Sequence, residues 1–340
     1  MAPNPPTMRS WLYTAPHPTL ATSLRLEPSV PFPFPSPPPP GHLIIRVHAA
    51  SLNPADYKLA SLPLVWRVMP RKPASPGMDF AGRVWAGGGA GGGVFAEGSR
   101  VFGRLAWPAQ HGALGEFILV PSSCVAGLPD EVGYEQGACL GTAGMTALQS
   151  LRGVREGSKV LVNGASGGVG TFGVQIARIL GAEVTGVCSG SNEGMVRELG
   201  AEVVDYKKVD VRQFVSGGQG RWDLVVDNVG TKGLLGACDG GVREGGKMVQ
   251  VGAGLDVGAA VEMVRNALLP RWAGGAKTRW QFLMVKNDSE DLARLAEWTR
   301  QGKLRPVIDS VFGYEEAPKA FERLMTGRAK GNVVVSSSWS

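Results

Sequence analysis

The residues that most narrowly define a chemistry in this chain are the glycines of segment 163–170, which reads NGASGGVG. An apolar stretch precedes the segment and apolar residues follow at helical spacing, so the glycines fall at a strand-to-helix turn. At such a turn the first amides of the helix attract negative charge, and glycine lets the backbone approach a pyrophosphate. The segment therefore predicts a dinucleotide phosphate-binding site.

The segment departs at one position from the dinucleotide pattern G-x-G-x-x-G. Ala165 takes the place of the first glycine, Gly167 would approach the pyrophosphate, and Gly170 would let the helix pack closely on the sheet. A glycine-rich turn that binds no ligand is the alternative interpretation. The predicted phosphate contacts are Ser166, Gly167, Gly168, Val169 and Gly170.

The next predicted strand, residues 183–188, ends where the adenosine ribose of a bound dinucleotide would lie. NAD enzymes usually carry Asp or Glu there, whereas this chain has the sequence SGSN at residues 189–192. Hydroxyl and amide donors without negative charge suit a 2′-phosphate, although Glu193 lies nearby in the sequence. This composition favours NADP(H) over NAD.

The chain has 340 residues, of which 44% are hydrophobic and 19% are charged, as in an ordinary folded protein with room for two domains. No apolar stretch approaches the roughly 18–20 residues that span a bilayer, so we expect no membrane span. The first residues resemble neither a secretory nor an organelle signal, and we expect a cytoplasmic protein.

The cysteines and the basic charge argue against other classes of protein. Cys124, Cys139, Cys188 and Cys238 are widely spaced and include no C-x-x-C pair, so we expect buried, reduced thiols rather than disulfides or structural zinc. The net charge is +6, but Lys and Arg are scattered without a long basic run, so we expect no nucleic-acid partner. An anionic cofactor suits this charge.

Predicted elements divide the chain into a β-rich first part and a part in which helices and strands alternate. A proline-rich loop is expected at residues 28–40 and a glycine-rich hairpin loop at 87–93. Expected strands are 43–47, 82–85, 99–102 and 116–120, then 160–163, 184–187, 224–227 and 248–251. Near the end we expect helices at 289–301 and 315–326 and strands at 307–311 and 332–335.

These pieces, in this order, resemble the medium-chain dehydrogenase/reductase superfamily, and within it the zinc-independent quinone oxidoreductase-like branch. The resemblance covers almost the whole chain and rests on the glycine-rich segment and on four others: 50–58 (ASLNPADYK), 76–82 (PGMDFAG), 140–147 (LGTAGMTA) and 331–335 (GNVVV). It implies an α/β protein. A GroES-like, β-rich catalytic domain would comprise residues 1–140 and 290–340, and a Rossmann NADP-binding domain with a doubly wound parallel sheet would comprise residues 141–289.

The zinc ligands of the superfamily are missing from this chain. Met78 stands where zinc-dependent members have histidine, a cysteine expected near Asn53 is absent, and the four histidines are spread apart. We therefore expect NADPH-dependent hydride transfer, without a metal, to a small electron-poor acceptor: a quinone or the C=C bond of an α,β-unsaturated carbonyl. An enoyl-thioester reductase of the fatty acid or polyketide type is the alternative enzyme, and a non-catalytic cofactor- or RNA-binding protein is the alternative of another class.

The resemblance also assigns individual residues. Tyr57 and Lys58 are the candidates for protonating the reduced substrate; alternatively, Tyr57 packs in the core, Lys58 is solvated and water supplies the proton. Segment 62–73 is expected at the substrate mouth, and segment 279–285 could pair across a homodimer. The assigned cofactor contacts are Asn53, Thr142 and Thr146 for the nicotinamide side, Ser189, Asn192 and Tyr206 for the 2′-phosphate, and Asn228, Val229, Val251 and Gly252 for the nicotinamide half.

Overall fold

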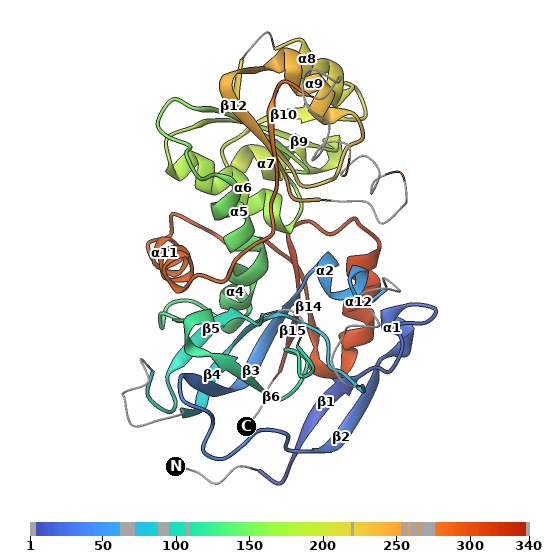
Figure 1. Cartoon of the computed structure of the whole chain (residues 1–340), viewed down its shortest axis with the longest axis vertical. Helices are drawn as coiled ribbons and strands as arrows, with labels where there is room; N and C mark the ends of the chain where they lie inside the picture. Colours follow the sequence, from blue (N-terminus) through green and yellow to red (C-terminus); the bar gives the residue numbers. More distant parts are fainter. Residues whose placement is uncertain are drawn as a thin grey trace. The chain divides into compact units, whose positions relative to one another are not determined.

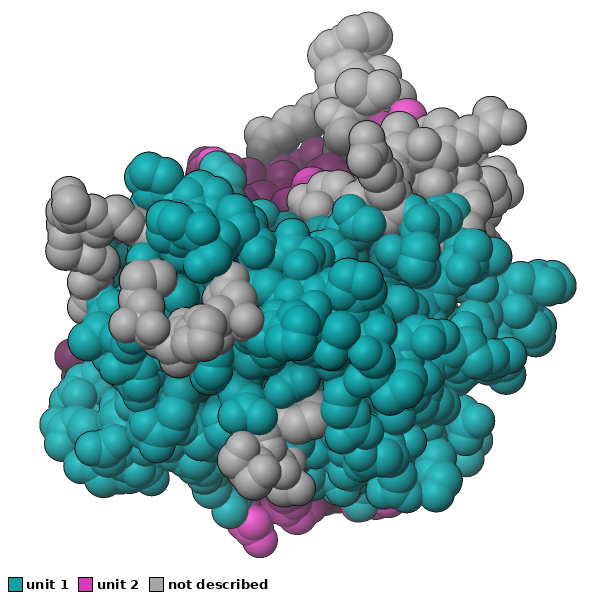
Figure 2. Space-filling view, turned by 90° about the horizontal axis from the view of Figure 1, so that it is seen from below, with its two compact units in different colours: residues 1–145, 286–340 teal, residues 146–285 magenta. Residues whose placement is uncertain are grey.

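The computed structural model describes residues 5–61, 72–87, 95–106, 109–218, 221–252, 258, 264 and 276–337. The chain forms two compact units: unit 1 comprises Met1–Met145 and Lys286–Ser340, and unit 2 comprises Thr146–Val285. Two stretches far apart in the sequence thus build one unit, coloured teal in Figure 2. Residues 62–71 of the expected substrate mouth and 88–93 of the expected hairpin loop lie outside the described residues.

Unit 1 is built on a mainly antiparallel sheet with the strand order β14-β15-β3-β4-β5-β7, in which β6 also pairs with β3 (Figure 1). Val333 of the last strand pairs with Leu52, so the C-terminal tail completes a sheet begun near the N-terminus. The strands are β3 (His42–Leu52), β4 (Asp79–Gly87), β5 (Arg100–Arg104), β6 (Phe117–Pro121), β7 (Val125–Gly127), β14 (Ile308–Gly313) and β15 (Asn332–Ser336).

Helices cover this sheet and close the unit 1 core. In α12 (Ala317–Met325) the residues Ala317, Ala320, Phe321 and Leu324 recur at helical spacing and are buried, so this helix packs one apolar face inward. The other helical elements are α1 (Leu20–Ser23), α2 (Pro54–Lys58), α4 (Tyr134–Cys139), α11 (Ser289–Arg300), the 3₁₀ turns η1 (Ser122–Cys124) and η5 (Tyr314–Glu316), and the π-helical turn η2 (Leu140–Gly144).

The proline-rich stretch 28–40 is not entirely a loop, which corrects the sequence expectation. Its first residues belong to β2 (Arg25–Pro31), which pairs with β1 (Thr7–Leu12) in a separate two-stranded sheet. Pro28 and Pro31 are tolerated there because a two-stranded ribbon consists only of edge strands, which do not need every backbone donor.

Unit 2 contains a parallel sheet with the strand order β10-β9-β8-β11-β12-β13. This order, in which the first strand lies beside the fourth, is that of a doubly wound Rossmann fold and confirms the predicted fold class. The strands are β8 (Lys159–Asn163), β9 (Glu183–Cys188), β10 (Glu202–Asp205), β11 (Trp222–Asp227), β12 (Val242–Gln250) and β13 (Arg279–Phe282); the helices are α5 (Met145–Ser150), α6 (Gly168–Ile179), η3 (Gly190–Asn192), α7 (Glu193–Glu198), α8 (Val211–Ser216) and α9 (Leu234–Gly241).

The apolar core explains why these strands form a parallel sheet. Leu161, Val225 and Met248 come from three adjacent strands and are buried together with Trp222 and Leu234. Strands covered on both faces need nearly continuous apolar runs, as in the VLV of β8. The sheet reverses its winding between β8 and β11, and at this switch point the carboxyl ends of the strands form a crevice in folds of this type.

All four cysteines are free and buried in the structure. Among the described residues, the helices are too short or too polar to cross a membrane. Strand β13 is an edge strand of the described sheet, and its pairing across a homodimer stays a prediction.

Candidate functional site

The glycine-rich turn joins β8 to α6 at the switch point of the unit 2 sheet. Gly164 has a φ of +76°, a conformation that favours glycine. A Cβ atom on Gly170 would lie 2.1 Å from the Gly164 carbonyl oxygen, so the close packing of helix and turn requires glycine there. A Cβ on Gly167 would meet no protein atom closer than 3.6 Å. Packing therefore does not require glycine at 167, and its small size leaves room beside the backbone.

The N-terminus of α6 has hydrogen-bond donors to offer. Gly167 is the N-cap residue and no side chain caps the helix. The first amide that bonds within the helix is that of Thr171, which donates to the Gly167 carbonyl at 2.9 Å. The preceding amides, of Gly168, Val169 and Gly170, have no carbonyl within the helix to bond. Together with the positive end of the helix dipole, they suit an anion.

The loop after β9 reaches back to this turn. Asn192 Nδ2 donates a hydrogen bond of 3.0 Å to the Ser166 hydroxyl, and the hydroxyls of Ser189 and Ser191 lie 3.0 Å apart. The carboxylate of Glu193 forms a salt bridge with Arg197 at 2.9 Å. Asn192, one of the residues predicted to bind the 2′-phosphate, therefore contacts the glycine-rich turn. The carboxylate of Glu193 is paired with the Arg197 cation.

A second carboxylate, that of Asp205, lies at the same edge and was not predicted. It ends β10, and its Oδ2 is 2.7 Å from the position that a Cβ on Gly190 would occupy. The pKa of the Cys188 thiol is raised to about 11 by burial, and the charges of Asp205 and Glu193 act in the same direction. Tyr206 follows with 54% of its surface exposed. The sequence feature that could have pointed to Asp205 is its position at the end of the strand next to β9.

The turn after β11 is held by Asp227, whose role was also missed. This carboxylate is fully buried and accepts hydrogen bonds from Asn163 Nδ2 at 2.8 Å and from the amides of Val229, Gly230 and Thr231 at 3.0, 3.1 and 2.8 Å. It thereby fixes the loop that continues beyond the carboxyl end of the strand. A carboxylate followed by small and β-branched residues at a strand end is the sequence signal for such a turn.

Asn228 in this turn has a buried atom that lacks a partner. Its Nδ2 donates to the Asn163 carbonyl at 3.1 Å, whereas its Oδ1 is buried and has no hydrogen-bond partner in the part of the chain that the structure describes. A buried acceptor without a donor is costly, and a bound ligand could supply that donor. Val229 is 58% exposed, and a Cβ on Gly252 would lie 2.3 Å from the Asn228 carbonyl. With Val251, these residues lie at the edge where they were predicted.

Asn53 begins helix α2 in unit 1, and Tyr57 and Lys58 end it. The backbone N–H of Asn53 donates to Asp56 Oδ2 at 2.7 Å, and this bond closes the first turn of α2. Tyr57 is half-buried and packs partly against the unit 1 core, and burial raises the pKa of its hydroxyl. Lys58 is half-exposed. The structure thus gives Tyr57 a packing contact with the core, and the catalytic roles of both residues stay predictions.

A buried carboxylate in unit 1 connects Asn53 with Thr142. Asp79 accepts from Asn53 Nδ2 at 2.8 Å, from the Thr142 amide at 2.8 Å and from the Thr142 hydroxyl at 2.6 Å. Burial raises the pKa of Asp79 to about 6 and that of Asp56 to about 7. Thr142 lies in the π-helical turn η2, a conformation often found at functional sites. Thr146 is buried in α5 and belongs to unit 2.

The residues around Met78 do not fit a zinc ion. Arg104 Nη2 lies 3.7 Å from the Met78 sulfur, and its Nε donates to Thr142 at 2.9 Å. A guanidinium at this place would repel a dication. In the described residues there is no group of three His, Cys, Asp or Glu side chains that could hold a metal.

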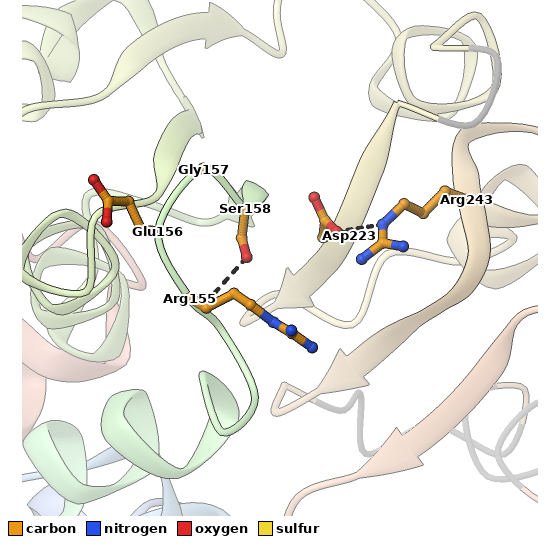
Figure 3. Close-up of a pocket in the computed structure, with 6 residues that line it drawn as sticks. All are labelled: Arg155, Glu156, Gly157, Ser158, Asp223 and Arg243. Carbon is orange, nitrogen blue, oxygen red and sulfur yellow. Dashed lines mark hydrogen bonds and ion pairs between the residues drawn. The ribbon is translucent and has the colours of Figure 1, made fainter.

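A shallow pocket of about 390 Å³ lies elsewhere in unit 2 (Figure 3). Asp223 points toward Arg243 and forms an ion pair with it, and Asp223 also accepts from the Lys159 amide at 2.7 Å. These residues begin β11, β12 and β8, so the pocket is at the amino edge of the sheet. Because ligands of parallel α/β sheets bind at the carboxyl edge, we do not assign the cofactor to it. Its lining is Arg155, Glu156, Gly157, Ser158, Asp223 and Arg243.

Comparison with known proteins identifies relatives along nearly the whole chain. The alcohol dehydrogenase GroES-like domain family matches residues 39–130, and the zinc-binding dehydrogenase family matches residues 199–335. The chain is 39% identical to the trans-enoyl reductase pgmF of Aspergillus terreus, covering 97% of this chain and 96% of that protein. It is 32% identical to the mitochondrial NAD(P)H oxidoreductase RTN4IP1 of Mus musculus, covering 86% and 81%. The quinone oxidoreductase of Coxiella burnetii has a similar structure, with a TM-score of 0.81, 28% identity and coverage of 97% and 99%.

Proposed function

The chain belongs to the medium-chain dehydrogenase/reductase superfamily, in its quinone oxidoreductase-like branch, and from this premise we propose that it uses NADPH to reduce the C=C bond of an α,β-unsaturated carbonyl compound. Its similarity to a trans-enoyl reductase over 97% of the chain carries the choice of reaction. Enoyl thioesters are therefore included among the substrates. Quinone reduction is the second candidate, favoured by the likeness to the Coxiella burnetii quinone oxidoreductase.

The residues of unit 2 fit a dinucleotide. We assign the pyrophosphate to the amides at the start of α6, where Gly167 leaves the backbone accessible. Ser189, Asn192 and Tyr206 are assigned to the 2′-phosphate. The buried Oδ1 of Asn228 supports a ligand with a donor group at the carboxyl end of β11, since such a donor would remove an unsatisfied acceptor.

NADPH, when bound, supplies a hydride equivalent from C4 of its nicotinamide, and the chain would supply orientation and exclusion of water. A substrate conjugated to a carbonyl is already electron-poor at its β-carbon, so the reaction does not need the zinc ion that the residues around Met78 do not fit. Protonation of the resulting enolate is assigned to Tyr57 or Lys58, or to water. A hydrogen-bond donor near the enolate oxygen would stabilise the developing charge.

The proposed reaction is tested by following NADPH oxidation with a crotonyl thioester, a short-chain enone and a benzoquinone. The proposal predicts turnover of at least one of the two conjugated carbonyl compounds, with the saturated product found by mass spectrometry. Turnover of the quinone alone would replace it by the second candidate. Tight NADPH binding without oxidation by any acceptor would contradict both and favour a non-catalytic cofactor-binding protein.

A further inference from the structure

Asp79 ties together two segments of unit 1 that are far apart in the sequence. Its side chain is fully buried at the start of β4, 26 residues from Asn53 and 63 residues from Thr142. One oxygen accepts from Asn53 Nδ2 and the Thr142 amide, and the other accepts from the Thr142 hydroxyl. Three donors on one carboxylate favour its charged form, which can only accept hydrogen bonds. All three contacts therefore have a fixed direction.

That direction decides which atoms of Asn53 remain available. The side-chain NH2 group of Asn53 carries two hydrogens. One is donated to Asp79 at 2.8 Å and the other to the Ser51 carbonyl at 3.3 Å. Both donors are thus directed into unit 1, and the remaining polar atom of the side chain, Oδ1, can only accept hydrogen bonds. Asn53 consequently offers an acceptor and no donor.

Thr142 is restricted in the same way. Its single hydroxyl hydrogen is directed to Asp79 Oδ1 at 2.6 Å, and its oxygen accepts from Arg104 Nε at 2.9 Å. The guanidinium is held in turn because Arg104 Nη1 donates to Asn287 Oδ1 at 2.9 Å. With its hydrogen committed, the hydroxyl of the half-buried Thr142 can only accept a further hydrogen bond.

Little space is available for the carboxylate to move. A Cβ atom on Gly141 would lie 2.6 Å from Asp79 Oδ1 and 2.7 Å from its Cγ, so the backbone of η2 packs directly against the carboxylate. Glycine at 141 is therefore needed to admit this contact, and a larger residue would displace Asp79 without removing any of its partners.

We propose that Asp79 is a positioning residue that makes Asn53 and Thr142 act as acceptors toward the hydrogen-bond donors of the nicotinamide group, the N–H groups of its carboxamide. The proposal rests on the proposed use of NADPH and on the assignment of Asn53 and Thr142 to the nicotinamide side, which the family resemblance implies. Asp79 does not contact the cofactor; it acts through the two side chains that it orients.

The test compares two ligands that differ only in the nicotinamide group: NADPH and 2′-phospho-ADP-ribose. In Asp79→Asn the one remaining oxygen can still accept from Asn53 Nδ2 and the Thr142 backbone N–H, so the new NH2 group faces the Thr142 hydroxyl. That hydroxyl must then accept from the NH2 group and turns its own hydrogen away, so Thr142 no longer offers a free acceptor. We expect the affinity for NADPH to fall about five- to tenfold, the loss of about one hydrogen bond, while that for 2′-phospho-ADP-ribose changes by less than about twofold. Affinities measured by titration calorimetry give both values without any substrate.

Asp309→Asn is the matched control. This carboxylate is also buried in unit 1, with 6% of its side chain exposed, and bonds Arg323 and the Lys330 amide. It should lower thermal stability as Asp79→Asn does, but leave the ratio of the two affinities unchanged. Equal losses for both ligands in Asp79→Asn, or no loss for NADPH, would overturn the proposal.

Two further variants keep the test decisive if Asp79→Asn does not fold. Gly141→Ala pushes the Asp79 carboxylate away, and Thr142→Val removes one acceptor. Both variants should bind NADPH more weakly and leave the affinity for 2′-phospho-ADP-ribose nearly unchanged. Unchanged NADPH affinity in both would also overturn the proposal. Because the readout is binding, a wild-type protein that binds NADPH but reduces no acceptor would contradict the proposed reaction alone.

Discussion

The carbonyl oxygen of Gly164 lies 2.1 Å from the position that a Cβ atom on Gly170 would occupy. Gly170→Ala should therefore force the start of α6 away from the turn, at a cost of about 1–3 kcal/mol, and lower the melting temperature of the cofactor-free protein by several degrees. Gly167→Ala should leave that temperature within about a degree, because its Cβ meets no protein atom closer than 3.6 Å.

With cofactor, both variants should bind NADPH more weakly than the wild type, Gly167→Ala because its methyl group occupies space assigned to the pyrophosphate. Differential scanning fluorimetry with and without NADPH measures both effects. If Gly167→Ala bound NADPH as the wild type does, the pyrophosphate would not lie against this backbone.

Asp205 is predicted to weaken NADPH binding. Its carboxylate lies against Gly190, close to the residues assigned to the 2′-phosphate, and like charges repel. Asp205→Asn should increase the affinity for NADPH about two- to fivefold and leave that for NADH nearly unchanged, with a larger effect at low salt. A loss of NADH affinity instead, measured by calorimetry, would mean that Asp205 binds a ribose hydroxyl.

Asp56 should make stability depend on pH. Burial raises its pKa from 3.8 to about 7, so between these values the folded protein binds more protons than the unfolded chain. The stability contributed by Asp56 is present below about pH 4 and is lost as the pH rises through 7. In Asp56→Asn this dependence disappears. The free energy of unfolding of the variant, relative to that of the wild type, should therefore rise by up to about 1.4 kcal/mol for each unit of increasing pH within this window.

Urea unfolding of both proteins at pH 5, 6, 7 and 8 checks this prediction. The difference in the free energy of unfolding isolates Asp56, because the other carboxylates are common to both proteins. Parallel stability curves would show that Asp56 titrates as it does in the unfolded chain.

Tyr57 and Lys58 are tested by their effect on turnover. Tyr57→Phe keeps the ring that packs on the unit 1 core, and Lys58→Ala removes the ammonium group. If one of them protonates the enolate, its loss should lower kcat about 10- to 100-fold while NADPH affinity changes little. Wild-type kinetics in both variants would leave water as the proton source.

Local patterns in the sequence were sufficient to predict the scaffold of unit 2. Each of these patterns indicates a local conformation: the glycines of 164–170, the apolar strands and the spacing between them. The order of the strands followed from the resemblance. The ends of strands were less predictable. The expected strand 43–47 is only the first part of β3, which extends to Leu52. It is longer because Ala49 to Leu52 pair with β15, which is far away in the sequence.

The carboxylates that hold the loops could not be predicted in the same way. The position of Asp227 at a strand end indicates a turn, but its bond with Asn163 joins residues 64 positions apart, and the bond between Thr142 and Asp79 joins residues 63 positions apart. A single sequence contains no signal for such pairings. Asp205 lies beside Gly190 only because β10 pairs with β9. For Tyr57, sequence alone left both packing and catalysis open, and the structure adds its contact with the core.

The central claim is that the chain is an NADPH-dependent reductase, and the most direct measurement is the shift in melting temperature produced by NADPH and by NADH at equal concentrations. A ligand at 100 times its Kd stabilises the protein by about 2.7 kcal/mol, so a tenfold preference is readily seen. We predict the larger shift with NADPH, followed by oxidation of that NADPH when a crotonyl thioester or an enone is added. A larger shift with NADH, or no shift with either, would contradict the claim.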